Sequence, residues 1–283
     1  MKTKTRVRLI LTLLLIAVSG QLLLAEKILL LTWNISNLGG SKDDAELAFM
    51  ANILQDYDVI ALQEVVARDP RGAQAVGRLA DELNRRGTRW DYRVSDPTRS
   101  PSAQMSERYA FLWKSAKIDL LGRPFLDSAL AEDCIREPYI GNFRCRGATQ
   151  SFFVVNFHSR VFSEHPELEI TLLRKYQAQL GTERVFINGD FNLDEEHPVW
   201  EDFYAVGYLP AIAASPTTLK RKCNAGNYLN HAIDNIYYDR DVVTRISAGR
   251  IDFVGSCALL EQARLISDHL PVYLVCELVV EQD

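Results

Sequence analysis

Polar residues able to perform acid–base or metal chemistry stand at the ends of apolar runs along this 283-residue sequence. These residues are Asn34, Glu64, Asp190 with Asn192, Asp234, and Asp268 with His269. Strand ends meet at one edge of a sheet, where carboxylates, amides and imidazoles are costly to desolvate unless they hold a cation or react. Each residue alone is more often an ordinary turn or strand-end residue, so the prediction depends on the order of the whole set.

Four short motifs contain most of these residues and follow one another along the chain. They are Trp33-Asn34, Leu62-Gln63-Glu64, Asn188-Gly189-Asp190-Phe191-Asn192 and Ser267-Asp268-His269. This series resembles the endonuclease/exonuclease/phosphatase superfamily of metal-dependent phosphoesterases. Four further stretches are similar to secreted deoxyribonuclease I-like endonucleases: Ser106-Glu107-Arg108-Tyr109, Arg136-Glu137-Pro138, Val155-Asn156-Phe157-His158-Ser159 and Ala232-Ile233-Asp234. The resemblance spans nearly the whole chain after residue 25.

The resemblance implies a metal-dependent phosphodiesterase, specifically a DNA endonuclease with low sequence specificity that works as a monomer. Phosphodiester hydrolysis needs an in-line water, neutralisation of the growing charge, and a proton or cation for the leaving oxygen. Glu64 offers a hard anionic oxygen for Mg²⁺ or Mn²⁺, and we expect Asn34 and Asp268 to assist directly or through water. Calcium is a further candidate ion, because the family has structural calcium sites.

His158 and His269 are the two histidines within motifs, and we expect both to contact the scissile phosphate. By resemblance, Glu107 orients His158 and Asp234 orients His269, each carboxylate fixing the tautomer and raising the basicity of its imidazole. The sequence leaves open which group is the general base and which the general acid.

Three more residues are expected at the phosphate. By resemblance, Asp190 and Asn192 face it, and Asn192 donates a hydrogen bond to the developing charge. Arg136, in its family position beside Glu137-Pro138, is expected to bind the phosphate. The other three histidines, His165, His197 and His231, are interpreted as ordinary surface or core residues.

Two departures from the deoxyribonuclease pattern concern the substrate. Val66 and Met105 occupy positions where that pattern has an arginine and a tyrosine that enter the minor groove. The nearby Arg68, Arg71, Arg99 and Arg108 are candidates to contact phosphates instead, which adds affinity without sequence readout. An alternative therefore stays open, a phosphoesterase of the same fold acting on a phospholipid or small phosphate ester, sphingomyelinase-like or inositol-phosphatase-like. A catalytically silent binding domain is disfavoured by the complete set of polar residues.

The first 25 residues are predicted to be a signal peptide. Four basic residues precede an uncharged, mostly apolar run over 9–25, and Ala25 is a small residue at a plausible cleavage point. We therefore expect a secreted or periplasmic protein. The remaining chain has 28 basic and 37 acidic residues, a net charge of −9, which argues against a generic polyanion-binding surface. Acidic residues around a divalent cation still form a local positive site, so nucleic acid stays open as a substrate.

All five cysteines lie beyond the predicted signal peptide. Cys134 and Cys145 close the shortest loop and are the first expected disulfide, and Cys223 and Cys257 are the second. Cys276 alternates within an apolar strand pattern and is expected to be a buried, inert thiol.

Apolar periodicity predicts alternating strands and helices. The expected strands are 27–33, 58–63, 90–94, 109–113, 118–121, 151–157, 184–188, 233–238 and 270–278, and the expected helices are 45–54, 72–86 and 166–180. Two early strand–helix units, a strand-rich middle and a further helix–strand unit favour two mostly antiparallel sheets packed face to face with helices outside. The predicted fold is thus an α/β (α+β) four-layer α/β/β/α sandwich, formed by one catalytic domain over 26–283.

Overall fold

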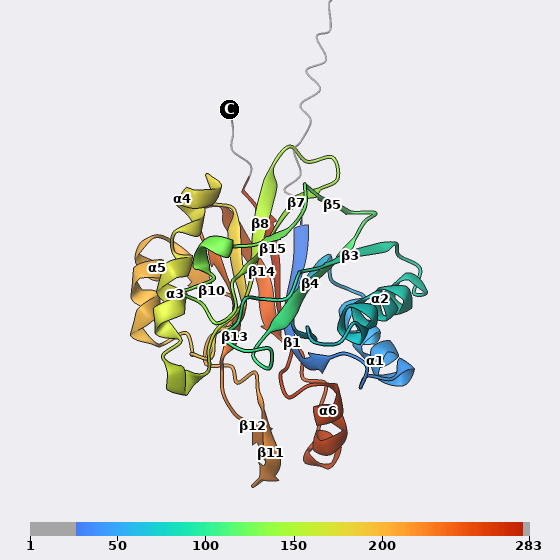
Figure 1. Ribbon diagram of the computed structural model, residues 1–283. Coiled ribbons are helices and arrows are strands. Elements are labelled where there is room, and N and C mark those ends of the chain that lie inside the picture. Colours follow the sequence, from blue (N-terminus) through green and yellow to red (C-terminus); the bar gives the residue numbers. More distant parts are fainter. Residues whose placement is uncertain (1–26, 280–283) are drawn as a thin grey trace, which may run out of the picture.

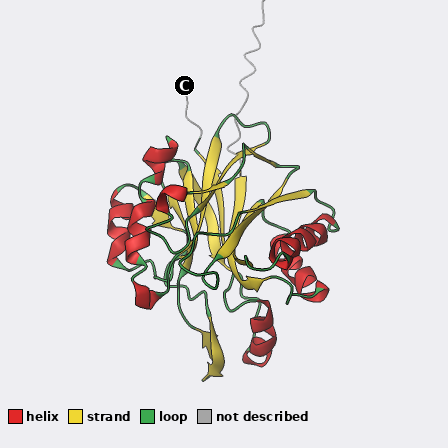
Figure 2. Ribbon diagram, in the orientation of Figure 1, coloured by secondary structure: helices red, strands yellow, loops and turns green. Residues whose placement is uncertain are grey.

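Two β-sheets pack face to face between two outer layers of helices in the computed structural model, which describes residues 27–279 (Figure 1). Figure 2 shows the strands in the middle and the helices on the flanks. The predicted four-layer sandwich is therefore confirmed. The predicted signal peptide, 1–25, lies outside the described residues. No helix in the described part of the chain is long and apolar enough to cross a membrane.

The first sheet has six strands in the order β14-β15-β1-β2-β4-β3. Their bounds are β1 (Lys27–Leu38), β2 (Val59–Val66), β3 (Trp90–Val94), β4 (Glu107–Lys114), β14 (Val243–Arg250) and β15 (Val272–Leu278). β1 and β2 are parallel, and the other pairs are antiparallel. Helices α1 (Asp44–Leu54) and α2 (Arg71–Asn84) cover its outer face.

The second sheet has seven strands, with the path β10-β13-β9-β8-β7-β5 and β6 paired to β7. Their bounds are β5 (Ile118–Leu120), β6 (Phe125–Leu126), β7 (Tyr139–Cys145), β8 (Ser151–His158), β9 (Val185–Asp190), β10 (Tyr208–Pro210) and β13 (Asp234–Asp239). β8 and β9 are parallel. Helices α3 (Glu167–Leu173), α4 (Tyr176–Leu180) and α5 (Glu201–Ala205) cover its outer face.

Strand alternation explains why the sheets are buried on both faces. Along β1, Ile28 and Leu30 enter the core between the sheets, whereas Leu31 and Trp33 face α1 and α2. α1 begins with a reciprocal cap in which the Asp43 carboxylate accepts from the Glu46 N–H, while the Glu46 carboxylate accepts from the Asp43 N–H.

The structure differs from the sequence prediction in several elements. The helix expected over 166–180 is two helices, with the break before Tyr176, whose buried hydroxyl donates to Asp127. β7, β14, α6 (Leu260–Ile266) and a separate hairpin of β11 (Leu219–Asn224) and β12 (Asn227–Leu229) were not expected. β14 is an edge strand and the hairpin stands apart from both sheets, so much of their surface is exposed and lacks a buried apolar pattern.

The first expected disulfide is wrong and the second is confirmed. Cys145 belongs to the core between the sheets, whereas Cys134 belongs to the core between the second sheet and its helices, so that sheet separates them. Cys223 and Cys257 are bonded. Cys276 is buried as expected, and burial raises the pKa of its thiol to about 12, which keeps it protonated and unreactive.

Candidate active site

One row of residues across the second sheet holds three of the predicted side chains. His158 at the end of β8 pairs in register with Asp190 of β9, and Asp190 pairs with Asp234 at the start of β13. Neighbouring strands lie roughly 4.8 Å apart, so the register alone brings the three together. Gly189, with φ of +139°, is required beside this row, because a Cβ there would lie 1.8 Å from the carbonyl oxygen of Phe157.

The first sheet supplies residues from the opposite side. Asn34 of β1 pairs with Gln63 of β2, and the next residue, Glu64, has a left-handed backbone with φ of 60°. Such a conformation costs a residue with a Cβ roughly 1–2 kcal/mol, and strain of this kind is concentrated at functional sites. The Glu64 carboxylate accepts hydrogen bonds from the Asn34 side-chain amide and from the Asn37 main-chain N–H, both at 3.1 Å.

The first histidine–carboxylate pair, His158 with Glu107, joins the two sheets. His158 Nδ1 lies 2.9 Å from Glu107 Oε2, and the Arg136 guanidinium lies 3.6 Å from the same oxygen. Arg136 also donates to the main-chain oxygens of His158 and Ser159, at 3.1 and 2.5 Å. The hydroxyl of Tyr109 accepts from the His158 N–H. We call His158, Glu107 and Arg136 the first arm.

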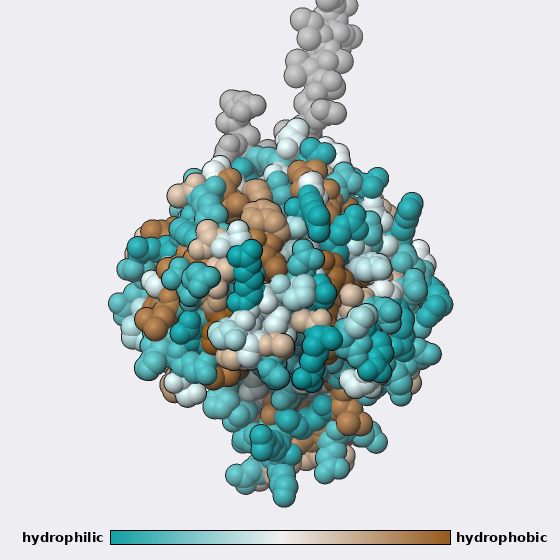
Figure 3. All heavy atoms as spheres, in the orientation of Figure 1, coloured by the Kyte–Doolittle hydropathy of each residue, from teal (hydrophilic) through white to brown (hydrophobic). Residues whose placement is uncertain are grey.

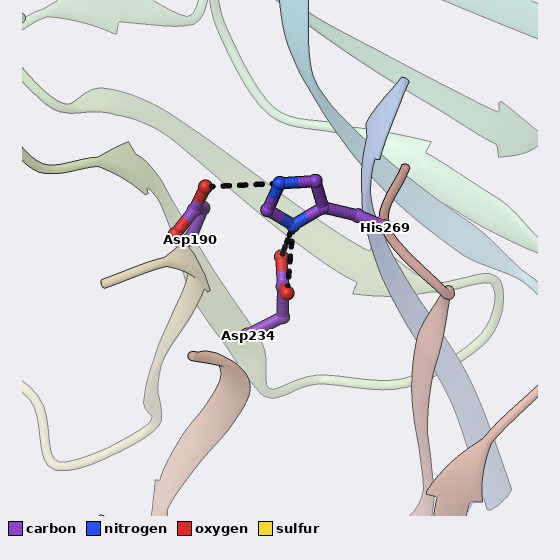
Figure 4. Close-up of side chains that lie close together, drawn as sticks. All are labelled: Asp190, Asp234 and His269. Atoms are coloured by element: carbon purple, nitrogen blue, oxygen red, sulfur yellow. Dashed lines mark hydrogen bonds and ion pairs between the residues drawn. The ribbon is translucent and has the colours of Figure 1, made fainter. Parts of the chain in front are cut away.

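The second pair is His269 with Asp234, and Figure 4 shows it beside Asp190. His269 Nδ1 lies 2.9 and 3.1 Å from the two carboxylate oxygens of Asp234. The Thr217 hydroxyl donates to Asp234 Oδ2 at 2.6 Å. Ser267 accepts from the His269 N–H and donates to the main-chain oxygen of Asn34, which fixes the start of this segment on β1. We call His269, Asp234 and Thr217 the second arm.

Asp190 stands between the two arms. Its Oδ2 atom lies 3.5 Å from His158 Nε2 and 3.7 Å from His269 Nε2, and it accepts from the Asn34 amide at 3.1 Å. Its Oδ1 atom accepts from the Asn192 N–H at 3.0 Å. Both histidines therefore direct their second ring nitrogen toward one oxygen atom, and the site is organised around that point.

Opposing electrostatic effects set the protonation of the first arm. Burial alone would raise the pKa of Glu107, but His158 and Arg136 hold it below the ordinary value. Burial and the Arg136 cation would lower the pKa of His158, yet Glu107 and Asp190 raise it above the ordinary value.

The second arm has no arginine, and its charges balance differently. Burial would lower the pKa of His269, but Asp234 and Asp190 outweigh burial and raise the pKa to about 10. Burial, with the negative charge of Asp190, raises the pKa of Asp234. Burial would also raise the pKa of Asp190, which His269 and His158 hold below its usual range. His269 is thus a cation at neutral pH.

A cavity of about 430 Å³ opens over these groups. The predicted site residues that line it are Glu64, Glu107, Arg136, His158, Asp190, Asn192 and His269. Val66, Arg68 and Met105 line the same cavity. The structure therefore gathers residues from both sheets around one open space large enough for a phosphate group and its neighbours.

Glu64 is suited to hold a divalent cation. Its carboxylate lines the cavity, its hydrogen bonds come from N–H groups, and within residues 27–279 it makes no ion pair with a cationic side chain. A hard anionic oxygen left without a cationic partner fits Mg²⁺ or Mn²⁺. A second set of ligand atoms, from Asp190, Asp234 and His269, lies within 4.8 Å of one another. Both nitrogens of His269 face carboxylates there, an arrangement that a protonated imidazole satisfies by itself.

The other two predicted metal residues lie outside the cavity lining. Asn34 is fully buried, and its amide nitrogen holds Glu64 and Asp190 while its oxygen accepts from the Ser36 N–H. Asp268 lies 3.4 Å from Arg264 and directly precedes His269. In this geometry Asn34 positions the Glu64 and Asp190 carboxylates through hydrogen bonds. The ligand role of Asp268 stays a prediction.

Several site residues were not found from the sequence. Thr217 and Tyr109 make hydrogen bonds to the arms. Tyr109 lies in a stretch that carries the family resemblance, but its hydroxyl was assigned no role, and no local pattern marks Thr217. Lys42 is buried and donates to the main-chain oxygens of Leu265 and Ile266, the last residues before the Ser267-Asp268-His269 motif. A lysine after an apolar strand gives no signal of this role, because its acceptors lie more than 220 residues away.

The sandwich fold and the cavity with two histidine–carboxylate pairs define a hydrolytic phosphoesterase. The chain belongs to the endonuclease/exonuclease/phosphatase family, whose model matches residues 31–269. It is 30% identical over 269 residues to a protein named deoxyribonuclease from Thioalkalivibrio sp. (strain K90mix), covering 88% of this chain and 70% of that protein. It is 27% identical over 274 residues to deoxyribonuclease-1 of Oryctolagus cuniculus, covering 91% and 93%.

Solved structures confirm the fold. A family protein from Bacteroides vulgatus superposes with a TM-score of 0.67 at 16% identity, over 90% of this chain and 100% of that chain. A mannosyl-6-phosphatase from Bacteroides thetaiotaomicron superposes with a TM-score of 0.63 at 18% identity, over 89% and 100%. At these identities the match concerns architecture.

Proposed function

We propose that this protein is a secreted endonuclease that hydrolyses DNA with little sequence preference and depends on Mg²⁺ or Mn²⁺. The convergence of His158 Nε2 and His269 Nε2 on one oxygen of Asp190, inside a cavity that also contains Glu64, is the observation that carries the proposal. The relatives named deoxyribonuclease, at 27–30% identity, support DNA as the substrate.

Different side chains of the site serve different steps of phosphodiester hydrolysis. His269, held as a cation by Asp234, stabilises negative charge on the phosphate. His158 and Asp190 lie beside the same position and hold or move the proton of the attacking water or the leaving oxygen. A divalent cation bound at Glu64 would supply Lewis-acid neutralisation of the phosphate charge.

The cavity walls favour contacts with the DNA backbone over base readout. Val66 and Met105 line the cavity where the deoxyribonuclease pattern has groove-reading residues, and Arg68 supplies an exposed positive charge beside them. Of the other suggested arginines, Arg71 pairs with Asp69, and Arg108 donates to the Ser95 oxygen. Low sequence specificity follows, because phosphate contacts carry no base information.

Secretion is supported by the cysteines as well as by the basic, then apolar, first 25 residues. The Cys223–Cys257 disulfide requires an oxidising compartment, such as the periplasm or the medium. Mass spectrometry of the exported protein should find an N-terminus close to residue 26. An intact N-terminus on exported protein would contradict cleavage there.

A second candidate function is hydrolysis of a small phosphate ester or a phospholipid by the same site. The apolar side chains of Val66 and Met105 in the cavity wall favour it. A solved structure of the same fold is named a mannosyl-6-phosphatase, which shows that the architecture also holds such a site.

A direct comparison of substrates separates the two candidates. Supercoiled plasmid, sphingomyelin and a sugar phosphate are each incubated with the protein in Mg²⁺, Mn²⁺ or EDTA. We expect rapid nicking of the plasmid with either metal, none in EDTA, and little turnover of the other two. Faster turnover of sphingomyelin or of the sugar phosphate than of plasmid would replace the nuclease proposal with the alternative.

A single substitution tests the metal site. Glu64→Gln removes the anionic ligand with little change in volume, so we expect metal-dependent activity to fall below about a tenth of wild type. The exposed Glu183→Gln is the matched control and should keep full activity. Retained activity in Glu64→Gln with an unchanged metal requirement would exclude Glu64 as the ligand.

A further inference from the structure

The β11–β12 hairpin is a basic element that projects beside the active site. Figure 1 shows it extending with α6 from the lower end of the sandwich, and Figure 3 shows mainly hydrophilic side chains there. β11 contains three consecutive basic residues, Lys220, Arg221 and Lys222. Arg221 and Lys222 are exposed and Lys220 is partly exposed. None of their side chains has a hydrogen bond or ion-pair partner within residues 27–279.

The charge of this segment contrasts with the rest of the chain. No acidic residue occurs between Asp202 and Asp234, although acidic residues outnumber basic ones in the whole sequence. Three cations that are wholly or partly exposed and form no ion pair with a carboxylate in the described chain produce a positive potential that attracts polyanions. An acidic protein would ordinarily neutralise such residues with neighbouring carboxylates, and here that neutralisation is missing within the described chain.

The base of the hairpin is bonded to the second arm of the active site. Thr218, the residue before β11, forms a β-bridge with His269, and the Leu219 N–H donates to the main-chain oxygen of Asp268 at 2.8 Å. Thr217 holds Asp234 in the second arm. At about 3.3 Å per residue, the basic residues 220–222 lie roughly 7–13 Å along the strand from Thr218. That distance spans about two to four nucleotides of a DNA strand, at roughly 3.4 Å per phosphate.

The hairpin is held in place on its inner side. Cys223 at its outer part is bonded to Cys257, and Arg264 of α6 donates to the Leu219 oxygen at 2.9 Å. A small core beneath it contains Leu219, Val254, Leu260, Ala263 and Leu270. The Tyr228 hydroxyl of β12 donates to Asp252 at 2.7 Å. The basic residues are therefore presented on a preorganised support, which lowers the entropy cost of binding.

We propose that the β11–β12 hairpin is a second nucleic-acid contact that holds the DNA phosphate backbone a few nucleotides from the scissile phosphate. The inference rests on the proposed nuclease function and adds a residue-level account of how a long substrate is held. A small phosphate ester in the cavity does not extend far enough to reach residues 220–222. The hairpin therefore acts on polymeric substrates and leaves hydrolysis of small ones unchanged.

The test replaces all three side chains and compares two substrates. In the Lys220→Gln/Arg221→Gln/Lys222→Gln variant, hydrolysis of bis(p-nitrophenyl) phosphate should equal wild type. KM for plasmid DNA should rise on the order of tenfold near 0.1 M salt with kcat unchanged, because uniform binding is lost. The plot of log kcat/KM against log salt should become shallower, by roughly one unit for each phosphate contact that is lost.

A second triple variant controls for net charge. Arg89, Arg240 and Arg245 are exposed and form no ion pair within residues 27–279, and Arg89 and Arg240 adjoin strand ends remote from the site. Their replacement by Gln removes the same charge and should leave the salt slope near wild type. Equal slopes for the two variants would overturn the hairpin contact, as would an equal loss on both substrates. Wild type that hydrolyses the small diester but does not cut DNA would instead overturn the proposed function itself.

Discussion

The two arms of the site share the same contact length but have different surroundings. In each, a histidine Nδ1 lies 2.9 Å from a carboxylate oxygen and its Nε2 faces Asp190. In the first arm Arg136 neutralises Glu107, so charge balance does not require a protonated histidine. In the second arm the carboxylate, Asp234, accepts from the neutral hydroxyl of Thr217 and has no arginine beside it. His269 itself must therefore be the cation that balances its charge.

This difference indicates that the two arms have different roles toward one phosphate, one stabilising charge and the other transferring a proton. The second arm keeps a permanent positive charge and stabilises negative charge in the transition state. The first arm has a fixed cation in Arg136, so His158 is free to gain or lose a proton without leaving a buried carboxylate unbalanced. The following predictions test whether the two arms differ in this way.

Removal of either histidine should have the largest effect. His158→Ala or His269→Ala removes proton transfer or charge stabilisation, each typically worth about 10²- to 10⁴-fold, so plasmid nicking should fall below about 1% of wild type. His165→Ala and His197→Ala serve as controls, since His165 is exposed and His197 caps a short helical turn remote from the cavity lining. Full turnover in His269→Ala, or equal damage in His165→Ala, would exclude the proposed constellation.

Loss of the carboxylates should affect stability unequally. Glu107→Gln leaves the buried Arg136 without its anionic partner, and a broken buried pair costs on the order of 3 kcal/mol in unfolding free energy. Asp234→Asn keeps hydrogen-bonding capacity near Thr217, and His269, unlike an arginine, can release its proton when its partner is lost, so this substitution should cost less, about 1 kcal/mol. Urea unfolding in EDTA measures both. A smaller loss for Glu107→Gln than for Asp234→Asn would show that Arg136 is not what distinguishes the arms.

The same two substitutions should reduce activity less than loss of a histidine. Each carboxylate orients an imidazole without contacting the phosphate, and outer partners of this kind typically contribute about 10- to 100-fold. The pH profile of kcat should also shift in Asp234→Asn, because His269 loses the group that raises its pKa. Turnover as low as in the histidine variants would mean that the carboxylates act directly on the substrate.

The pH dependence of the unfolding free energy tests the charge of the second arm. The pKa of His269 is raised to about 10 in the folded chain, so its stabilising effect is fully present below about pH 6.5 and is lost as pH rises toward 10. In EDTA, the unfolding free energy of wild type should decline over this range, and His269→Asn should flatten the decline. His165→Asn should behave like wild type. Parallel curves for wild type and His269→Asn would contradict the protonated second arm.

The ends of several strands could be predicted from the sequence. The structure shows that many of the active-site residues lie at these strand ends, so their grouping was predictable. His158 and Asp190 end apolar runs and Asp234 begins one, and these runs become adjacent strands in register, so the convergence of the three residues follows from the fold. Apolar periodicity and the order of the elements predicted the four-layer sandwich, and the order of motifs indicated the family, but periodicity alone does not specify which strands pair.

The parts that could not be predicted depend on contacts between distant segments. Arg136 was expected to bind phosphate, whereas the structure also places its guanidinium beside Glu107 and on two main-chain oxygens. The Cys134–Cys145 expectation used loop length and ignored the sheet between the two side chains. The hairpin was missed because a short, exposed, basic strand has no apolar pattern to mark it.

The central claim is that His158 and His269 face one phosphate. Inorganic phosphate can be titrated in EDTA while the histidine Cε1–H signals are followed by NMR, with His158→Ala and His269→Ala used for assignment. The account predicts that the signals of these two histidines shift together with a single dissociation constant, while those of His165 and His197 stay in place. A shift of one signal alone, or of both with different dissociation constants, would show that the two arms do not share a phosphate.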